Sequence, residues 1–193
     1  MVSSIFFNLH AAETNDELET IAQQIAPQLA AFGNDITLNF DLFKRVQQVY
    51  NQKDKLGLDE EQLTLLNKSY KDFVRNGALL NETDKATLRE IDAELSVLKL
   101  KFGEHVLAET NNYQLHITQE HELAGLPEGA IEAAKDLATS LEKDGWIFTL
   151  DYPSYIPFVT YADNRDIRKE LVIAAGRKAF QDNEFNNEKI VLR

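Results

Sequence analysis

The stretch from Asp84 to His105, "DKATLREIDAELSVLKLKFGEH", decides the fold of this chain. Its large apolar residues recur at steps of three and four, which is the spacing of one face of an α-helix: Leu88, Ile91, Leu95, Leu98 and Phe102. The pattern predicts a helix from about residue 83 to 109, with this stripe as a packed seam. Such a long, regular helix should be the backbone of an antiparallel helical bundle.

A further helix is predicted upstream of this stretch. Thr14 and Glu17 match the T-x-x-E capping box that begins many helices. The apolar residues that follow keep helical spacing as far as Phe32, and Gly33 marks the expected end.

Two more helices should follow before the long one. One runs from about 41 to 55 and stops at Gly57. The next has Asp59 and Gln62 at its start and closes at Asn76-Gly77. Successive helices of this kind imply helix packed on helix.

The periodicity changes to two after residue 112, which predicts a strand over 113–118. A second strand is predicted at 146–152, and between the two lies a helix that stops at Gly145. Such strands can pair as an antiparallel ribbon or as a parallel crossover unit, and we favour the ribbon.

The segment 151–158, "DYPSYIPF", holds two prolines and three aromatic residues, and is interpreted as a rigid, packed loop. Another helix should begin at Asp163 or Asn164, and "NNEKIVLR" at 186–193 resembles the opening of a helix. The expected fold is therefore mainly α: an antiparallel helical bundle with a small two-stranded β element.

We expect residues 1–193 to form a single compact, mostly helical body. Within it, 1–111 is the helical bundle, 112–152 the strand-helix-strand element, and 153–193 a connecting loop with helices. The net charge of −12 argues against nucleic acid and anionic membrane partners, because binding to them depends on neutralising phosphate groups. No apolar run approaches the roughly 20 residues of a membrane helix, and there is no cysteine.

The dipeptide His121-Glu122 begins the zinc-peptidase signature H-E-x-x-H, in which two histidines one helical turn apart bind the metal. The fifth position here is Gly125, which offers no ligand and, before Leu126-Pro127, indicates a turn. His116 lies five residues from His121 and completes no metal pair. His105 continues the apolar stripe of the long helix and is interpreted as a hydrogen-bonded, partly buried residue.

Acidic clusters have simpler interpretations than catalysis. Asp59 to Glu61 should complement a helix N-terminus, and Glu90 with Glu94 should lie on a solvated face. The run 182–188, "DNEFNNE", lacks the glycine of an EF-hand loop. No phosphate-binding glycine motif or hydrolase serine motif is present. We therefore assign no catalytic, cofactor-binding or metal-binding residue.

The order of segments resembles the N-terminal half of the thimet-oligopeptidase-like zinc peptidases, and most closely the bacterial peptidyl-dipeptidase branch. The similarity covers about Thr14 to Arg193 and is carried by these stretches: "ETNDEL" at 13–18, "LFKRVQQVYNQKDKLGLDEEQLTLLNKSYKDFVRNGALL" at 42–80, "DKATLREIDAELSVLKLKF" at 84–102, "ELAGLPEGAI" at 122–131, "FTLDYPSYIPF" at 148–158 and "YADNRDIRKELVIAAGRKA" at 161–179.

This resemblance implies that "ELAGLP" is a structural passage and that His121 before it is incidental. In the family, the H-E-x-x-H helix lies in the C-terminal half, and no position here matches it, so no zinc ligand is carried over. The resemblance implies zinc only in the parent protein, a peptidase with a helical body and a deep channel that admits short peptides. On this basis 153–193 leads into a missing C-terminal catalytic half.

Two functions are compatible with the sequence. The favoured one is a non-catalytic N-terminal scaffold and channel-wall portion of a zinc-dependent oligopeptidase that releases C-terminal dipeptides from short peptides; this chain alone is not expected to be an enzyme. The alternative is a free-standing helical protein-interaction module. Expected partners are the missing catalytic half and, through the parent, short peptides, while the segment alone could form a non-native dimer. A cytoplasmic location is expected, with a periplasmic parent as the alternative because the family chains start earlier.

Overall fold

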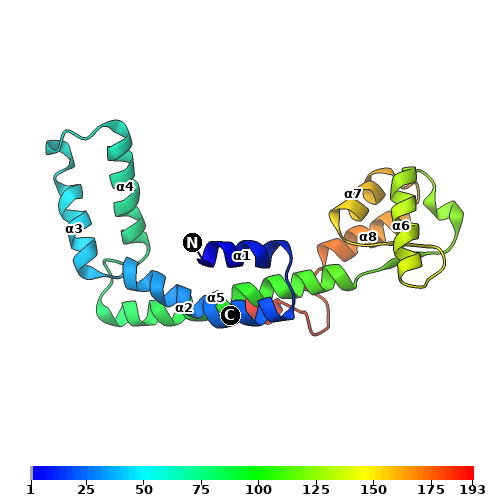
Figure 1. Cartoon of the computed structure of the whole chain (residues 1–193), viewed down its shortest axis with the longest axis horizontal. Coiled ribbons are helices and arrows are strands. Elements are labelled where there is room, and N and C mark those ends of the chain that lie inside the picture. Colours follow the sequence, from blue (N-terminus) through cyan, green and yellow to red (C-terminus); the bar gives the residue numbers. More distant parts are fainter. Residues whose placement is uncertain (1) are drawn as a thin grey trace. The chain divides into compact units, whose positions relative to one another are not determined.

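The computed structural model describes residues 2–193. About 72% of the chain is helical. Nine α-helices and one small antiparallel sheet are found in this described part (Figure 1). This confirms the mainly α fold with a two-stranded β element. The chain divides into two compact units, residues 1–100 and 101–193, and each is described by itself.

The elements of the first unit are α1 (Val2–Ala12), α2 (Asp16–Thr37), α3 (Phe40–Asn51), a short 3-10 helix (Lys53–Lys55), α4 (Glu60–Arg75) and the first part of α5 (Glu82–Asn112). The second unit contains the end of α5, β1 (Leu115–Ile117), a 3-10 helix (Glu120–Leu123), α6 (Glu128–Ser140), β2 (Trp146–Phe148), α7 (Tyr152–Tyr161), α8 (Arg165–Gly176) and α9 (Glu188–Leu192).

An aromatic cluster joins α3 and α4 into a hairpin. The rings of Tyr50 and Tyr70 are stacked with centroids 3.9 Å apart, and Phe43 lies 5.9 Å from both Tyr70 and Phe73. Aromatic pairs at these distances add to the free energy gained by burying their area. The cluster therefore fixes which faces of the two helices meet.

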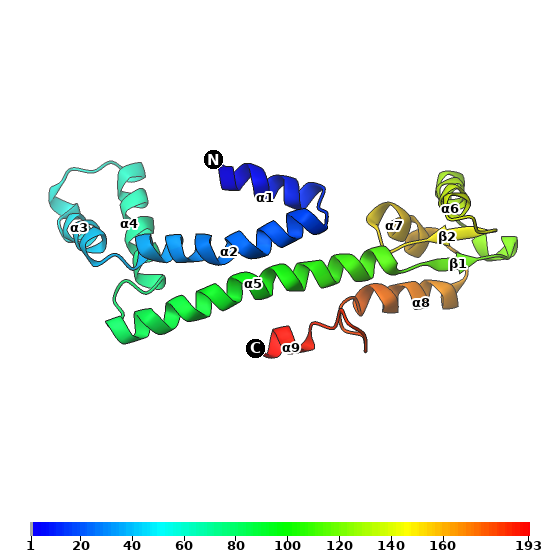
Figure 2. The same ribbon diagram turned by 60° about the horizontal axis from the view of Figure 1, so that its bottom comes forward.

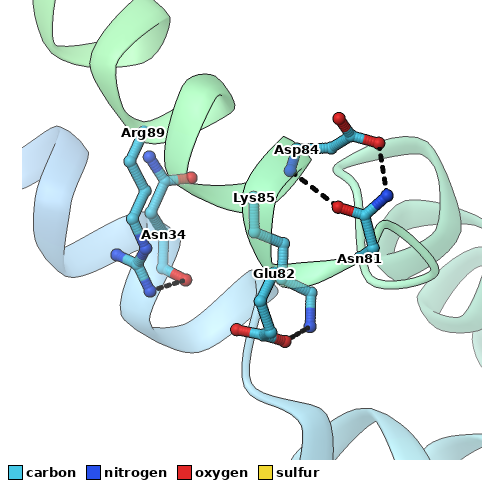
Figure 3. A network of polar contacts seen from close by, with 6 residues as sticks. All are labelled: Asn34, Asn81, Glu82, Asp84, Lys85 and Arg89. Atoms are coloured by element: carbon cyan, nitrogen blue, oxygen red, sulfur yellow. Dashed lines mark hydrogen bonds and ion pairs between the residues drawn. The ribbon is translucent and has the colours of Figure 1, made fainter.

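Helices α2 and α5 run side by side in opposite directions (Figure 2). Arg89 of α5 joins them, because its Nη1 lies 2.8 Å from Asp35 Oδ1 and its Nη2 donates to the backbone oxygen of Asn34 (Figure 3). Both acceptors lie near the C-terminal end of α2, where a positive charge is also favoured by the helix dipole. One arginine thus fixes the register of the pair.

The apolar stripe of α5 is less buried than the sequence predicted. Ile91, Leu95 and Phe102 remain 53%, 40% and 38% exposed, respectively. The spacing correctly predicts that these residues share one face of a helix, but it does not show how much of that face is covered. Within the described residues, the predicted packed seam is therefore only partly covered.

The core of the second unit lies between its small sheet and the helices α7 and α8. Strands β1 and β2 are antiparallel with Leu115 opposite Phe148, which confirms the ribbon rather than the parallel crossover. Phe148 packs edge to face on Phe158 of α7, with centroids 4.7 Å apart, and Leu171 of α8 is fully buried beside them. Since an isolated two-stranded ribbon is marginally stable, these helices must stabilise it.

The segment predicted as a rigid loop is helix α7. Pro153 stands in its first turn, where the missing N–H has no helical partner to lose. Pro157 lies inside the helix and costs one backbone hydrogen bond, but Phe158 beside it is fully buried. Tertiary packing therefore outweighs the propensity of proline to break helices.

The start of α2 also differs from the prediction. Asn15, not Thr14, is the cap, and its side chain accepts a hydrogen bond from the backbone N–H of Leu18 at 3.0 Å. Gly33 does not end the helix, which continues to Thr37. The sequence reasoning also missed α1 altogether. By contrast, Asp59 and Gln62 form the predicted capping box of α4.

The boundary between the two units lies inside α5, after Leu100. The predicted division into 1–111, 112–152 and 153–193 stays a prediction. A helix boundary and a unit boundary need not coincide, because a long helix can provide packing surfaces at both ends. That the whole chain forms one compact body stays a prediction.

Replacing Asn15 by alanine should lower the free energy of unfolding by about 1 kcal/mol, because the N–H of Leu18 loses its acceptor. Replacing Thr14 by valine should leave stability unchanged or raise it, since the buried Thr14 hydroxyl has no hydrogen-bond partner. Urea unfolding followed by circular dichroism measures both. The opposite ranking would restore Thr14 as the cap.

Candidate functional site

The partial zinc signature does not form a metal-binding helix. His121 and Glu122 lie in the short 3-10 helix Glu120–Leu123, and the chain leaves this helix at Ala124. Gly125 then has a φ of +86°, which ends any helical geometry. The turn predicted at this position is confirmed, and a second ligand one helical turn after His121 is absent.

The passage that follows is packed into the core of the second unit. Leu123 and Leu126 are buried on either side of the turn, and the backbone oxygen of Ala124 accepts a hydrogen bond from the N–H of Asp163 at 2.8 Å. A Cβ atom on Gly125 would lie 2.3 Å from the backbone oxygen of Tyr161. The glycine is therefore required by both conformation and space, and its role is to join this turn to the start of α8.

His105 is a hydrogen-bonded residue, as the sequence indicated. Its Nδ1 lies 2.8 Å from Oδ1 of Asn187, which is fully buried. The amide nitrogen of Asn187 donates to the backbone oxygen of Phe102, so Oδ1 must face the histidine as an acceptor. The proton of His105 therefore sits on Nδ1. This pair ties α9 to the last turns of α5.

The side chain of Glu109, four residues after His105 in α5, is a buried carboxylate. Glu109 is 8% exposed, and both of its oxygens accept side-chain N–H groups, from Gln181 at 2.9 Å and from Asn183. No lysine or arginine pairs with it in the described residues. Amide donors satisfy both carboxylate oxygens, so the segment 181–187 holds the chain against the end of α5.

The second unit also has a groove of about 880 Å³ between α6, β2 and α7. Small and apolar residues such as Ala133, Ile147 and Pro157 line it. Its polar groups are largely bonded to one another: Ser154 Oγ accepts from the N–H of Thr149, and the Thr149 hydroxyl donates to Asp151. The surface is better suited to packing against another segment than to acid-base chemistry.

Tyr113 is the titratable group that the fold perturbs most clearly. Burial raises its pKa above the usual value, and the negative charge of Glu170 raises it further. Its hydroxyl is buried without a hydrogen-bond partner in the described structure, while the ring packs against the core. The residue is thus held neutral as a core group.

Within residues 2–193, no group of three or more His, Cys, Asp or Glu side chains is arranged to hold a metal ion. His116 is engaged elsewhere, since its Nε2 lies 2.6 Å from the backbone oxygen of Asp144. None of the described helices combines the length and the apolar character needed to cross a membrane.

Replacing Gly125 by alanine should lower the free energy of unfolding by about 2 kcal/mol or more, because alanine is strained at positive φ and its Cβ meets a backbone oxygen. Gly129→Ala is the matched control. It lies in α6 with open space around the new Cβ, so it should be neutral or raise stability by about 0.5 kcal/mol. Equal stability of the two variants in urea would contradict the role of Gly125.

Tyr113→Phe should make the fold less sensitive to alkali. A raised folded-state pKa means that the neutral phenol stabilises the protein fully below about pH 10, the unfolded value, and that this contribution is lost as pH rises through the folded pKa. Phenylalanine cannot ionise, so above pH 10 the free energy of unfolding of the variant should rise relative to that of the natural protein. Tyr152→Phe, at an exposed position, is the control and should leave the pH dependence of stability unchanged. Unfolding at a series of pH values measures the difference.

No protein-family model matches the chain, but several characterised proteins are similar to it over nearly its whole length. The dipeptidyl carboxypeptidases of Escherichia coli and Salmonella typhimurium are 33% and 35% identical over all 193 residues. Oligopeptidase A of Haemophilus influenzae is 30% identical over 188 residues, which is 95% of this chain. The chain spans 28% of the length of each of these relatives. It is homologous to the N-terminal part of the dipeptidyl carboxypeptidase and oligopeptidase A family.

Proposed function

We propose that this chain is the non-catalytic N-terminal scaffold and channel-wall portion of a zinc-dependent oligopeptidase of the peptidyl-dipeptidase type. The zinc ion and the catalytic residues belong, in this proposal, to the part of the protein that follows residue 193. The parent would release dipeptides from the C-termini of short peptides. The observation that carries the proposal is the similarity of the entire chain to 28% of two dipeptidyl carboxypeptidases.

The contacts within the chain support a scaffold rather than a reaction centre. The side chains that could do chemistry are used for structure: Asp59 caps a helix, His105 binds Asn187, and Glu109 accepts two amides. The partners of His105 and Glu109 come from distant parts of the chain, so these two side chains hold separate segments together. A channel wall needs this kind of rigidity, because the geometry of a site depends on the elements that support it.

Exposed apolar side chains also support the proposal. Phe32, Leu65 and Phe40 are each more than 60% exposed, and α5 leaves much of its apolar stripe uncovered. Covering these side chains with a partner would remove apolar area from water, which is favourable. The rest of a larger peptidase is the partner that the homology favours.

The test compares the full-length gene product, this 193-residue chain, and the remainder of the protein, each assayed for dipeptide release from a short peptide. We expect the full-length protein to be active and to lose activity with a chelator, and this chain alone to be inactive. Mixing the chain with the remainder should restore chelator-sensitive cleavage. Gly125→Ala, which perturbs the fold of the second unit, should reduce this restoration, while Gly129→Ala should not.

Metal-dependent cleavage by the 193-residue chain alone would overturn the scaffold assignment. An inactive full-length protein would favour the second candidate, a helical protein-interaction module. The observation behind this alternative is a groove of about 430 Å³ on the α3–α4 hairpin, lined by Val46, Val49, Leu65 and Leu66. An apolar groove between two helices can accept a third amphipathic helix.

A further inference from the structure

A second groove, of about 480 Å³, lies within the first unit where the start of α3 meets the turn that precedes α5. Its lining residues include Phe40, Phe43 and Lys44 of α3, and Leu79, Glu82 and Lys85 from the turn and the start of α5. Its volume is within the range of small-ligand pockets, and its walls are mainly apolar. It contains a charged group that the proposed scaffold role does not use.

That group is the ammonium of Lys85. The side chain of Lys85 is only 6% exposed, so the charged end as well as the aliphatic stem is withdrawn from water. A buried ammonium has three N–H donors and is unfavourable unless they are paired. In the described part of the chain, Nζ is paired only with Glu82 Oε1, at 3.0 Å (Figure 3). The Glu82 side chain is itself 89% exposed.

Nearby polar groups do not compete for Lys85. Asn81 and Asp84 bond to each other, by an N–H to Oδ1 bond of 2.9 Å and an amide to carboxylate bond of 2.8 Å (Figure 3). Arg89 is bound to the end of α2. Within the described residues, Glu82 is therefore the one carboxylate that pairs with Lys85, and its own side chain is exposed, so another carboxylate could take its place.

The groove also presents a second positive charge. Lys44 lines it, with Nζ 5.9 Å from the centroid of the Phe40 ring. Phe40 and Leu79 are both 61% exposed, so a ligand could cover apolar area as well as meet the two ammonium groups. In a chain whose net charge is −12, this local combination of positive charge and apolar surface is complementary to an anion with a hydrophobic part.

We propose that this groove binds an apolar carboxylate, meaning a single carboxylate joined to a hydrophobic group of side-chain size. The carboxylate replaces Glu82 as the partner of Lys85, and the hydrophobic group covers Phe40 and Leu79. Two sources share this chemistry: the C-terminal residue of a short peptide and a free organic acid. The inference does not rest on the scaffold role, because the groove lies within this chain and binding there requires no cleavage.

The experiment is a titration of the isotope-labelled 193-residue chain followed by NMR. The ligands are N-acetyl-Leu-Phe and 4-phenylbutyrate, each compared with its own carboxamide. Each carboxylate that binds should do so at least ten-fold more tightly than its amide, with the largest shifts in residues 78–85. Binding of the dipeptide but not of 4-phenylbutyrate identifies a peptide C-terminus as the source. Equal affinity for the two acids shows that a carboxylate with an apolar group is sufficient for binding.

Two variants test the assigned contacts. Lys85→Met keeps an apolar stem of similar length and should weaken binding at least ten-fold, while Glu82→Gln removes the competing carboxylate and should strengthen it several-fold. Unchanged far-ultraviolet circular dichroism is the control for folding. If Lys85→Met fails to fold, Glu82→Gln and the amide comparison still decide the question. Equal binding of acid and amide, no binding of either acid, or weaker binding by Glu82→Gln would overturn the proposal.

Discussion

Each compact unit depends on polar side chains that α5 contributes to it. This helix of 31 residues contributes Arg89 to the first unit, where the guanidinium fixes α2. It contributes His105 and Glu109 to the second unit, where they hold α9 and the segment before it. A helix spaces its side chains at a fixed rise of about 1.5 Å per residue, so within each unit the anchoring groups of α5 have a defined spacing along the helix.

The anchoring role of these side chains explains the buried polar groups of the second unit. Asn187 is fully buried and Glu109 nearly so, and each has its hydrogen bonds satisfied by other parts of the chain. Buried polar groups that are fully paired specify one arrangement, because any alternative leaves a donor or acceptor unpaired. Lys85 stands apart from this pattern, since its one partner among residues 2–193 is an exposed carboxylate.

Local sequence signals predicted much of the fold, and they failed where packing decided. The capping box of Asp59 and Gln62 formed because both partners lie within one turn. The similar pattern at Thr14 and Glu17 did not, because the next residue, Asn15, also carries an accepting side chain and took the cap position. The two prolines of 151–158 indicated a loop, yet burial of Phe158 stabilises a helix there.

The sequence by itself determined the helical class, the turn at Gly125 and the absence of a local zinc motif, since these follow from neighbouring residues or from simple periodicity. It left the pairing of the two strands open, and the structure decided for the antiparallel ribbon. Only the tertiary structure decided which side chains pair across long separations, such as His105 with Asn187 and Arg89 with Asp35. It also decided how little of the α5 stripe is covered and that Lys85 is buried in a groove. Burial depends on which distant segments pack on a surface, and no local pattern contains that information.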